Sequence, residues 1–287
     1  MDLRHILAAT DESDAGREAV RVAHNLRSRA SARVTVLRVM AAEATRQLVG
    51  TASGVGPDDD ARDEPALRHL RRWLEADVLL PSAIQDVELA TAAGVPGIEI
   101  CRFAERVQAD LLVLGRKRHS RLMRLLLGDT GDAVARRSRF PSLFVPSGMA
   151  DIRRLLVALD GSERGMNVLN QACDFARQVG AGLQPITVER TPANEPLELV
   201  TNLPLGRSVS LEVRTQAVLK EKGLPTVPLA IRRGEVVDRI VEEAQETEAN
   251  VLVVGYHRGG PPGVIEAGSI ARRLLHASPC AVLTIPL

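Results

Sequence analysis

The chain has 287 residues, a formal net charge of +1, 45% hydrophobic residues and only 2% aromatic residues. This length suits two domains that can each bury a core. The near-neutral charge and the few aromatic side chains argue against a nucleic-acid-binding protein, and no apolar run approaches the roughly 20 residues of a membrane span.

The first half of the sequence is predicted to alternate short apolar strands with amphipathic helices. The first helix has the clearest signals, because Ser13 can cap its amino end and Ala19, Ala23 and Leu26 recur on one face. Strands are expected over 3–9, 33–40, 85–91, 110–115 and 142–146, and helices over 14–29, 62–77, 97–108 and 129–139.

The second half repeats the first. Asp11 corresponds to Asp160, 149 residues later, whereas Gly115 corresponds to Gly255, 140 residues later. The difference places extra residues of the first half in a loop within 41–60. The repeat predicts strands over 153–159, 183–189, 226–231, 250–255 and 281–285, and helices over 163–180, 208–222, 235–248 and 269–277.

This order of elements predicts an α/β protein with two tandem open parallel five-stranded sheets flanked by helices, a Rossmann-like architecture. The expected domains are residues 1–147 and 151–287, with a short linker over Pro146–Ala150. Ligands of open parallel sheets bind beyond the carboxyl ends of the strands, where the strand order reverses. The residues that follow the strands are therefore the candidate site residues.

Each half carries an acid and a pair of glycines at such positions. Asp11 and Asp160 follow the first strands, and Gly115 and Gly255 end the fourth strands. Glycines at a strand end and at a helix start let backbone amides approach an anion. If the first and fourth strands are neighbours, the acid and the glycine loop face one crevice. We expect the acid to bind ribose hydroxyls or magnesium and the loop to bind phosphates, while Val39 or Val188 lies against a base.

These residues resemble the universal stress protein family in its tandem two-domain form, over nearly the whole chain. ATP-binding members of that family carry an Asp after the first strand and a loop of the form Gly-x2-Gly-x9-Gly-Ser/Thr. The loop corresponds to Gly115–Thr130 in the first half and to Gly255–Ser269 in the second. Arg118 and Arg258 replace the second glycine of the motif, and Asp129 stands in the Ser position of the first half. The second half is therefore the better match to a nucleotide site.

The resemblance implies an adenine nucleotide alpha hydrolase-like fold and a nucleotide-sensing stress regulator that binds ATP, with or without Mg²⁺, and catalyses at most weak ATP hydrolysis. The residues expected to bind nucleotide in the second half are Asp160, Gly161, Ser162, Val188, Gly255, Arg258, Gly268, Ser269 and Ile270. Those of the first half are Asp11, Val39, Gly115, Arg118, Gly128 and Thr130. The sequence assigns no catalytic residue and identifies no metal ligand.

Two other functions remain open. One is a scaffold whose nucleotide sites have decayed and which works through dimerisation; the resemblance implies a homodimer, or pairing of the two halves, along the last strands, Leu143–Val145 and Ala281–Ile285. The other is a nucleotide-dependent transferase or ATPase, for which His257 is the one candidate base. The sequence lacks the phosphate-loop, nucleophile-elbow and zinc-protease motifs, which favours binding over turnover.

Cysteine usage and the start of the sequence bear on the compartment. Cys101, Cys173 and Cys280 are odd in number and widely spaced, as expected for buried thiols of a reduced protein. The sequence begins with a predicted strand and shows no secretory signal. We therefore expect a cytoplasmic protein.

Overall fold

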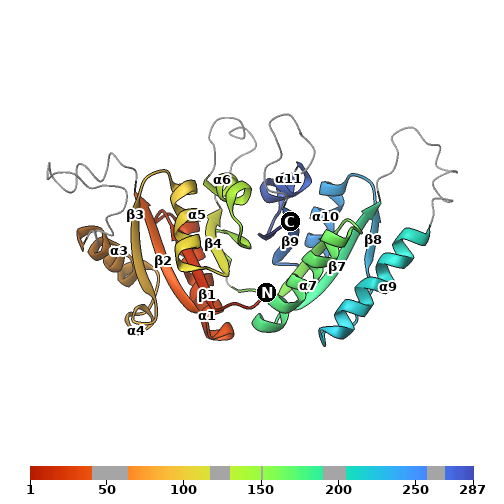
Figure 1. Ribbon diagram of the computed structural model, residues 1–287, viewed down its shortest axis with the longest axis horizontal. Helices are drawn as coiled ribbons and strands as arrows, with labels where there is room; N and C mark the ends of the chain where they lie inside the picture. The colour runs from red at the N-terminus through yellow and green to blue at the C-terminus, as the bar shows by residue number, and fades with distance from the viewer. Residues whose placement is uncertain (41–63, 117–129, 150, 190–204, 257–268) are drawn as a thin grey trace. The chain divides into compact units, whose positions relative to one another are not determined.

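The computed structural model describes residues 1–40, 64–116, 130–149, 151–189, 205–256 and 269–287. Contacts between Cα atoms divide the chain into two units. The first unit is Leu3–Ala150, and the second is Asp151–Leu287 together with Met1–Asp2. Each unit is an α/β domain in which helices flank parallel strands (Figure 1).

The first unit has five parallel strands in the order β3-β2-β1-β4-β5. Figure 1 shows β3, β2, β1 and β4 side by side in this order. In chain order the elements are β1 (His5–Thr10), α1 (Asp14–Ala30), β2 (Arg33–Met40), α3 (Glu64–Asp77), α4 (Pro81–Ile84), β3 (Glu88–Ala93), α5 (Pro96–Val107), β4 (Leu111–Arg116), α6 (Thr130–Arg137) and β5 (Ser142–Pro146).

The second unit repeats this topology in the order β8-β7-β6-β9-β10, and all of its neighbouring strands are parallel. Its elements are β6 (Arg154–Leu159), α7 (Glu163–Val179), β7 (Gly182–Glu189), α9 (Leu205–Glu221), β8 (Ala230–Arg233), α10 (Val236–Glu246), β9 (Val251–Tyr256), α11 (Ser269–Ala277) and β10 (Ala281–Pro286). The α/β fold with parallel five-stranded order in each half is as the sequence predicts.

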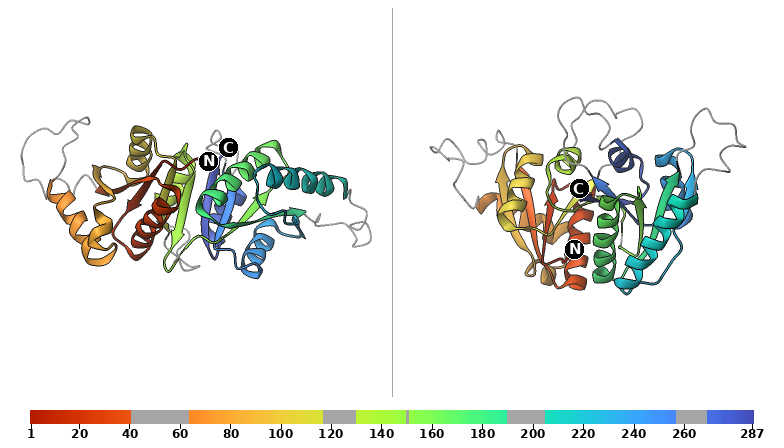
Figure 2. Two further views of the ribbon diagram at one scale, coloured as in Figure 1. Left: turned by 90° about the horizontal axis from the view of Figure 1, so that it is seen from below. Right: turned by 45° about the vertical axis from the view of Figure 1, so that its right-hand side comes forward.

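Helices cover both faces of each unit's strands. In the first unit α1 and α3 lie on one face, where the Arg21 side chain of α1 donates to the carbonyl oxygens of Asp77 and Val78 at the end of α3. Helices α5 and α6 pack against each other on the opposite face. In the second unit α7 pairs with α9, and α10 pairs with α11. The left view of Figure 2 shows α1 and α3 on one side of their sheet and α5 on the other.

The predicted first helix is confirmed, whereas two predicted strands begin later than expected. The helix α1 starts after Ser13 and buries Ala19, Ala23 and Leu26 against the sheet. A short helix, α4, with Pro81 in its first turn delays β3 to Glu88. Proline fixes φ near its helical value, which suits a first turn, and the sequence analysis overlooked that signal.

The third strand of the second unit, predicted over 226–231, is β8 at Ala230–Arg233. The backbone before β8 does not join the sheet. Instead the side-chain amides of Gln184 and Gln216 donate to the carbonyl oxygens of Pro228 and Val227 at 2.8 and 2.6 Å. Proline lacks the N–H that a strand ladder needs, so Pro228 explains the late start of β8.

The three cysteines are free thiols. Cys173 and Cys280 are buried, as predicted, but Cys101 is only half-buried, so the prediction is wrong for that residue. Burial raises the pKa of Cys173 to about 12 and that of Cys101 to about 11. Both thiols are therefore protonated and weakly nucleophilic at neutral pH.

An ion pair ties α7 to the end of α9 in the second unit. Lys222 Nζ donates to Asp174 Oδ1 at 2.7 Å, and the amino group of Met1 reaches Asp174 Oδ2 at 2.7 Å. Burial alone would raise the pKa of Asp174, but the hydrogen bonds from Lys222 and the Met1 amino group outweigh burial and lower that pKa. The ionised carboxylate thus stabilises the folded state.

The lowered pKa of Asp174 gives a testable pH dependence. Its stabilising effect is present above the pKa of the unfolded state, about 3.9, and is lost as the pH falls through the lower folded-state pKa. We expect Asp174→Asn to reduce the free energy of unfolding at pH 7 by about 0.5–1 kcal/mol, the scale of a partly exposed pair. Urea unfolding at pH 7 and pH 3 checks this: the gap between wild type and variant should shrink at pH 3, and an unchanged gap would contradict the assignment.

Candidate functional site

The strand order in each unit reverses between the first and fourth strands. From β1 the chain passes to β2 on one side, while β4 and β5 lie on the other side of β1. The parallel register pairs Ala9 with Leu114, so the next residues along the two strands, Thr10 and Gly115, lie side by side. In the second unit β6 pairs with β9 in the same way. The acid that follows the first strand and the glycine near the end of the fourth therefore lie at adjoining strand ends, at the position where open sheets bind ligands.

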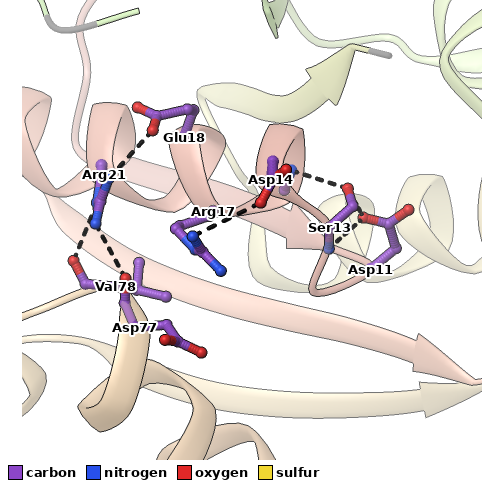
Figure 3. A network of polar contacts seen from close by, with 9 residues as sticks. Asp11, Ser13, Asp14, Arg17, Glu18, Arg21, Asp77 and Val78 are labelled. Atoms are coloured by element: carbon purple, nitrogen blue, oxygen red, sulfur yellow. Dashed lines mark hydrogen bonds and ion pairs between the residues drawn. The ribbon is translucent and has the colours of Figure 1, made fainter. Parts of the chain in front are cut away.

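A compact turn fixes Asp11 at the end of β1. Its Oδ1 accepts hydrogen bonds from the Ser13 backbone N–H, at 3.1 Å, and from the Ser13 hydroxyl. The Ser13 Oγ in turn accepts from the backbone N–H of Gly16 at 3.3 Å and caps α1. Figure 3 shows Asp11 and Ser13 at the start of α1, with the ion pairs of Arg17 with Asp14 and of Arg21 with Glu18 further along the helix.

Asp160 lies in an equivalent turn at the end of β6. Its Oδ1 accepts from the backbone N–H of Ser162 at 2.9 Å and from the Ser162 hydroxyl at 2.7 Å, and Ser162 Oγ accepts from the Gly165 N–H at 3.0 Å. The Asp160 side chain is exposed. Among the residues that the structure describes, its contacts all use Oδ1, which leaves Oδ2 as an anionic acceptor for a ligand.

Two glycines that the sequence analysis did not select make these turns possible. A Cβ atom on Gly165 would lie 2.4 Å from Asp160 Oδ1, and one on Gly16 would lie 2.9 Å from Asp11 Oδ1. Both distances are shorter than real Cβ contacts, so any side chain at these positions would displace the carboxylate. The recurring pattern Asp-x-Ser-x-x-Gly, 149 residues apart, was the signal that identifies them.

The glycines that end the fourth strands are in close contact with other elements. A Cβ atom on Gly115 would lie 2.4 Å from the backbone carbon of Ala15 and 2.6 Å from the backbone nitrogen of Gly16. On Gly255 it would lie 2.7 Å from the Leu287 side chain and 3.0 Å from that of Val168. Gly115 thus allows the first turn of α1 to approach β4, in addition to any part it has in ligand binding.

Some of the remaining predicted site residues lie within the described part of the chain, and the others lie outside it. Val39 and Val188 are half-buried near the ends of β2 and β7, while Thr130, Ser269 and Ile270 begin α6 and α11. Gly161 lies in the turn after Asp160 with a φ of 78°. Arg118, Gly128, Arg258 and Gly268 lie outside the described residues, as does His257. The structure therefore describes the acids that follow β1 and β6, whereas most of the residues of the loops predicted to bind phosphate lie outside the described part of the chain.

No three His, Cys, Asp or Glu side chains come together as a metal-binding group in the described part of the chain. Nor does any described helix have the length and apolar character needed to cross a membrane.

Comparisons with known proteins agree with the repeat and the fold. The model of the universal stress protein family matches residues 2–146 and again 151–286. Universal stress proteins of Mycobacterium tuberculosis and Mycobacterium bovis are 28% identical over 186 residues, which is 61% of this chain and 61% of each relative. The match thus spans about three-fifths of the length of these curated relatives.

Solved structures include similar folds. The crystal structure of a universal stress protein from Archaeoglobus fulgidus has a TM-score of 0.71 and 18% sequence identity, and the match covers 100% of this chain and 99% of that one. At this level of identity the likeness shows the fold. A universal stress protein from Archaeoglobus fulgidus in complex with dAMP matches 47% of this chain and 98% of its own, with 23% identity and a TM-score of 0.34.

Proposed function

Because the chain belongs to the universal stress protein family, we infer that its second unit binds ATP or a related nucleotide and that the protein acts as a nucleotide-sensing regulator with little or no catalysis. The observation that carries this inference is the carboxylate of Asp160. It is fixed at the end of β6 beside β9, at the reversal of strand order, and no hydrogen bond found among the described residues uses its Oδ2.

The described residues fit the parts of a nucleotide. A carboxylate oxygen is a strong acceptor for ribose hydroxyls, and it is also a ligand that magnesium prefers. The start of α11 at Ser269 supplies backbone N–H groups and a positive helix end, which suit phosphate. Half-buried Val188 at the end of β7 offers an apolar surface for a base.

Regulation by binding suits the site better than turnover. The contacts of Asp160 within the described residues are to Ser162, whose hydroxyl donates to the carboxylate and also caps α7. This arrangement orients the acid, and within the described part of the chain no imidazole, amine or thiol forms a hydrogen bond or ion pair with it. A catalytic role would need such a partner within hydrogen-bond reach of the reacting group.

Asp160→Asn tests the proposal directly. The amide keeps an oxygen that can accept from Ser162, so the turn is retained while the negative charge is lost. Because hydrogen bonds to charged groups contribute about 1.5–3 kcal/mol, we expect nucleotide affinity to fall roughly tenfold to a hundredfold. Isothermal titration with ATP, with and without Mg²⁺, measures the change.

The matched control is Asp11→Asn in the first unit, which should leave the affinity of the second unit unchanged. Equal affinity of wild type and Asp160→Asn would contradict the role of Asp160. Absence of ATP binding by the wild type at millimolar concentration would reject the nucleotide proposal and favour the scaffold function.

A further inference from the structure

The residue that follows the site carboxylate differs between the two units. It is Glu12 after Asp11 and Gly161 after Asp160. Both residues have left-handed backbone, with φ of 61° for Glu12 and 78° for Gly161. Glycine adopts this conformation freely, whereas another residue costs roughly 1–2 kcal/mol there. The first unit therefore keeps a strained side chain at a position where the second unit has none.

An ion pair and a hydrogen bond hold the Glu12 side chain across the carboxyl end of the sheet. Its Oε1 lies 3.0 Å from Arg38 Nη1 near the end of β2, and its Oε2 lies 3.1 Å from His69 Nε2 on α3. The contact between Glu12 Oε1 and Arg38 is an ion pair whose geometry does not meet that of a hydrogen bond. The backbone N–H of Glu12 donates to Thr10 Oγ1 at 3.0 Å. Only 16% of the Glu12 side chain and 26% of the Arg38 side chain are exposed, so the pair fills space at this edge.

The second unit has a different set of residues at the same places. Thr187 takes the position of Arg38, because Thr10 pairs with Arg38 and Leu159 pairs with Thr187 in the sheets. The hydroxyl of Thr187 donates back to the carbonyl oxygen of Leu159 at 2.9 Å, within the sheet. The Thr187 hydroxyl is therefore used within the sheet.

The helix position of His69 corresponds to Arg214. The two helices α3 and α9 each bury a stripe of residues at four-residue spacing, Ala66, Leu70 and Leu74 in one and Leu211, Thr215 and Leu219 in the other. When these stripes are superposed, His69 falls on Arg214. Arg214 Nη1 donates to the Gly161 carbonyl oxygen at 3.3 Å, and its Nη2 donates to Glu163 at 2.6 Å. Each unit thus covers this turn with a basic side chain from the same helix position.

We propose that Glu12 is a built-in occupant that closes the first unit to anionic ligands, so that the chain has one nucleotide site. Its carboxylate adds a second negative charge beside Asp11, neutralises the Arg38 guanidinium, which would otherwise attract a phosphate, and occupies the His69 imidazole. Gly161 places no carboxylate in the corresponding space of the second unit, where Arg214 pairs with the exposed side chain of Glu163. This inference rests on the proposed function in one respect, namely that the second unit binds a nucleotide.

The number of ATP molecules bound per chain tests the proposal. Isothermal titration should give one for wild type and two for Glu12→Gly, which also relieves the left-handed strain. Glu12→Gln, which keeps the shape and removes the charge, should likewise add a binding event. Two molecules bound by wild type, or one by wild type and by both variants, would overturn the role of Glu12 while the proposed function stands.

If wild type binds no ATP, the variants still distinguish the proposed second-unit site from the role of Glu12. If Glu12→Gly then binds one molecule, the proposed second-unit site is wrong and the role of Glu12 holds; if it binds none, both fail. Glu105→Gln is the matched control, because Glu105 pairs with Arg139 near the carboxyl end of α5 and should leave the stoichiometry unchanged. Circular dichroism establishes that each variant is folded.

A reciprocal pair of variants transfers the acid to the second unit. Gly161→Glu and Gly161→Gln place side chains of equal size on the same left-handed backbone, so they differ only in charge. We expect ATP affinity to be at least tenfold lower for the Glu variant than for the Gln variant. Equal affinities would show that charge at this position does not control access, and would overturn the proposal.

Discussion

Replacement of Gly115 by alanine should destabilise the first unit by at least about 3 kcal/mol. The new Cβ would lie 2.4 Å from the backbone carbon of Ala15, 2.6 Å from its carbonyl oxygen and 2.6 Å from the backbone nitrogen of Gly16. Overpacking of a core typically costs 1–3 kcal/mol when side chains can yield. Here the obstacle is the backbone of the first helical turn, so α1 must move away from β4 and loses its packing there.

Urea unfolding followed by circular dichroism measures this effect. Gly182→Ala is a matched control, because a Cβ atom at the start of β7 meets nothing closer than the Arg153 carbonyl oxygen at 3.8 Å. Gly255→Ala is the comparison in the second unit, where the neighbours are the side chains of Leu287 and Val168 and can partly adjust. A Gly115 variant as stable as the Gly182 variant would show that α1 and β4 are not in such close contact.

The role of Gly115 illustrates what the sequence can and cannot predict. A buried apolar run followed by glycine is a local signal, and it predicts Gly115 at the end of the fourth strand; β4 ends one residue later, at Arg116. The contact of Gly115 with the first turn of α1 joins residues about one hundred positions apart. No local pattern encodes that contact, since it depends on β1 and β4 being neighbours in the sheet. The duplication was the only hint, because Gly255 recurs at the same place.

The turns that follow the first strands were predictable from the sequence. The capping by Ser13 and Ser162 depends on residues within three positions of one another, so the sequence suffices to predict it. The position of β8 was missed because the prolines before it remove backbone donors. The closure of one site by Glu12 was also missed, because its partners Arg38 and His69 come from distant elements.

The second large effect is expected for Gly165→Ala, and it should appear in ligand binding while the free energy of unfolding hardly changes. The added Cβ would lie 2.4 Å from Asp160 Oδ1, and its next neighbours, including the Asp160 backbone nitrogen, are at 3.5 Å. Only the carboxylate must therefore move. Alanine is favoured over glycine in a helix by roughly 1 kcal/mol, which offsets the weakened turn between Asp160 and Ser162.

Displacement of the carboxylate should nonetheless abolish its contact with a nucleotide. Ligand hydrogen bonds depend on positions fixed to within about 0.5 Å, and the Asp160 side chain would have to shift by more than that. We expect ATP affinity to fall at least tenfold, with a urea midpoint close to that of wild type. Gly16→Ala makes the matched change beside Asp11 and should leave ATP affinity unaltered, because Glu12 already occupies that site. Retained affinity in the Gly165 variant would mean that nucleotide recognition does not depend on the orientation of Asp160.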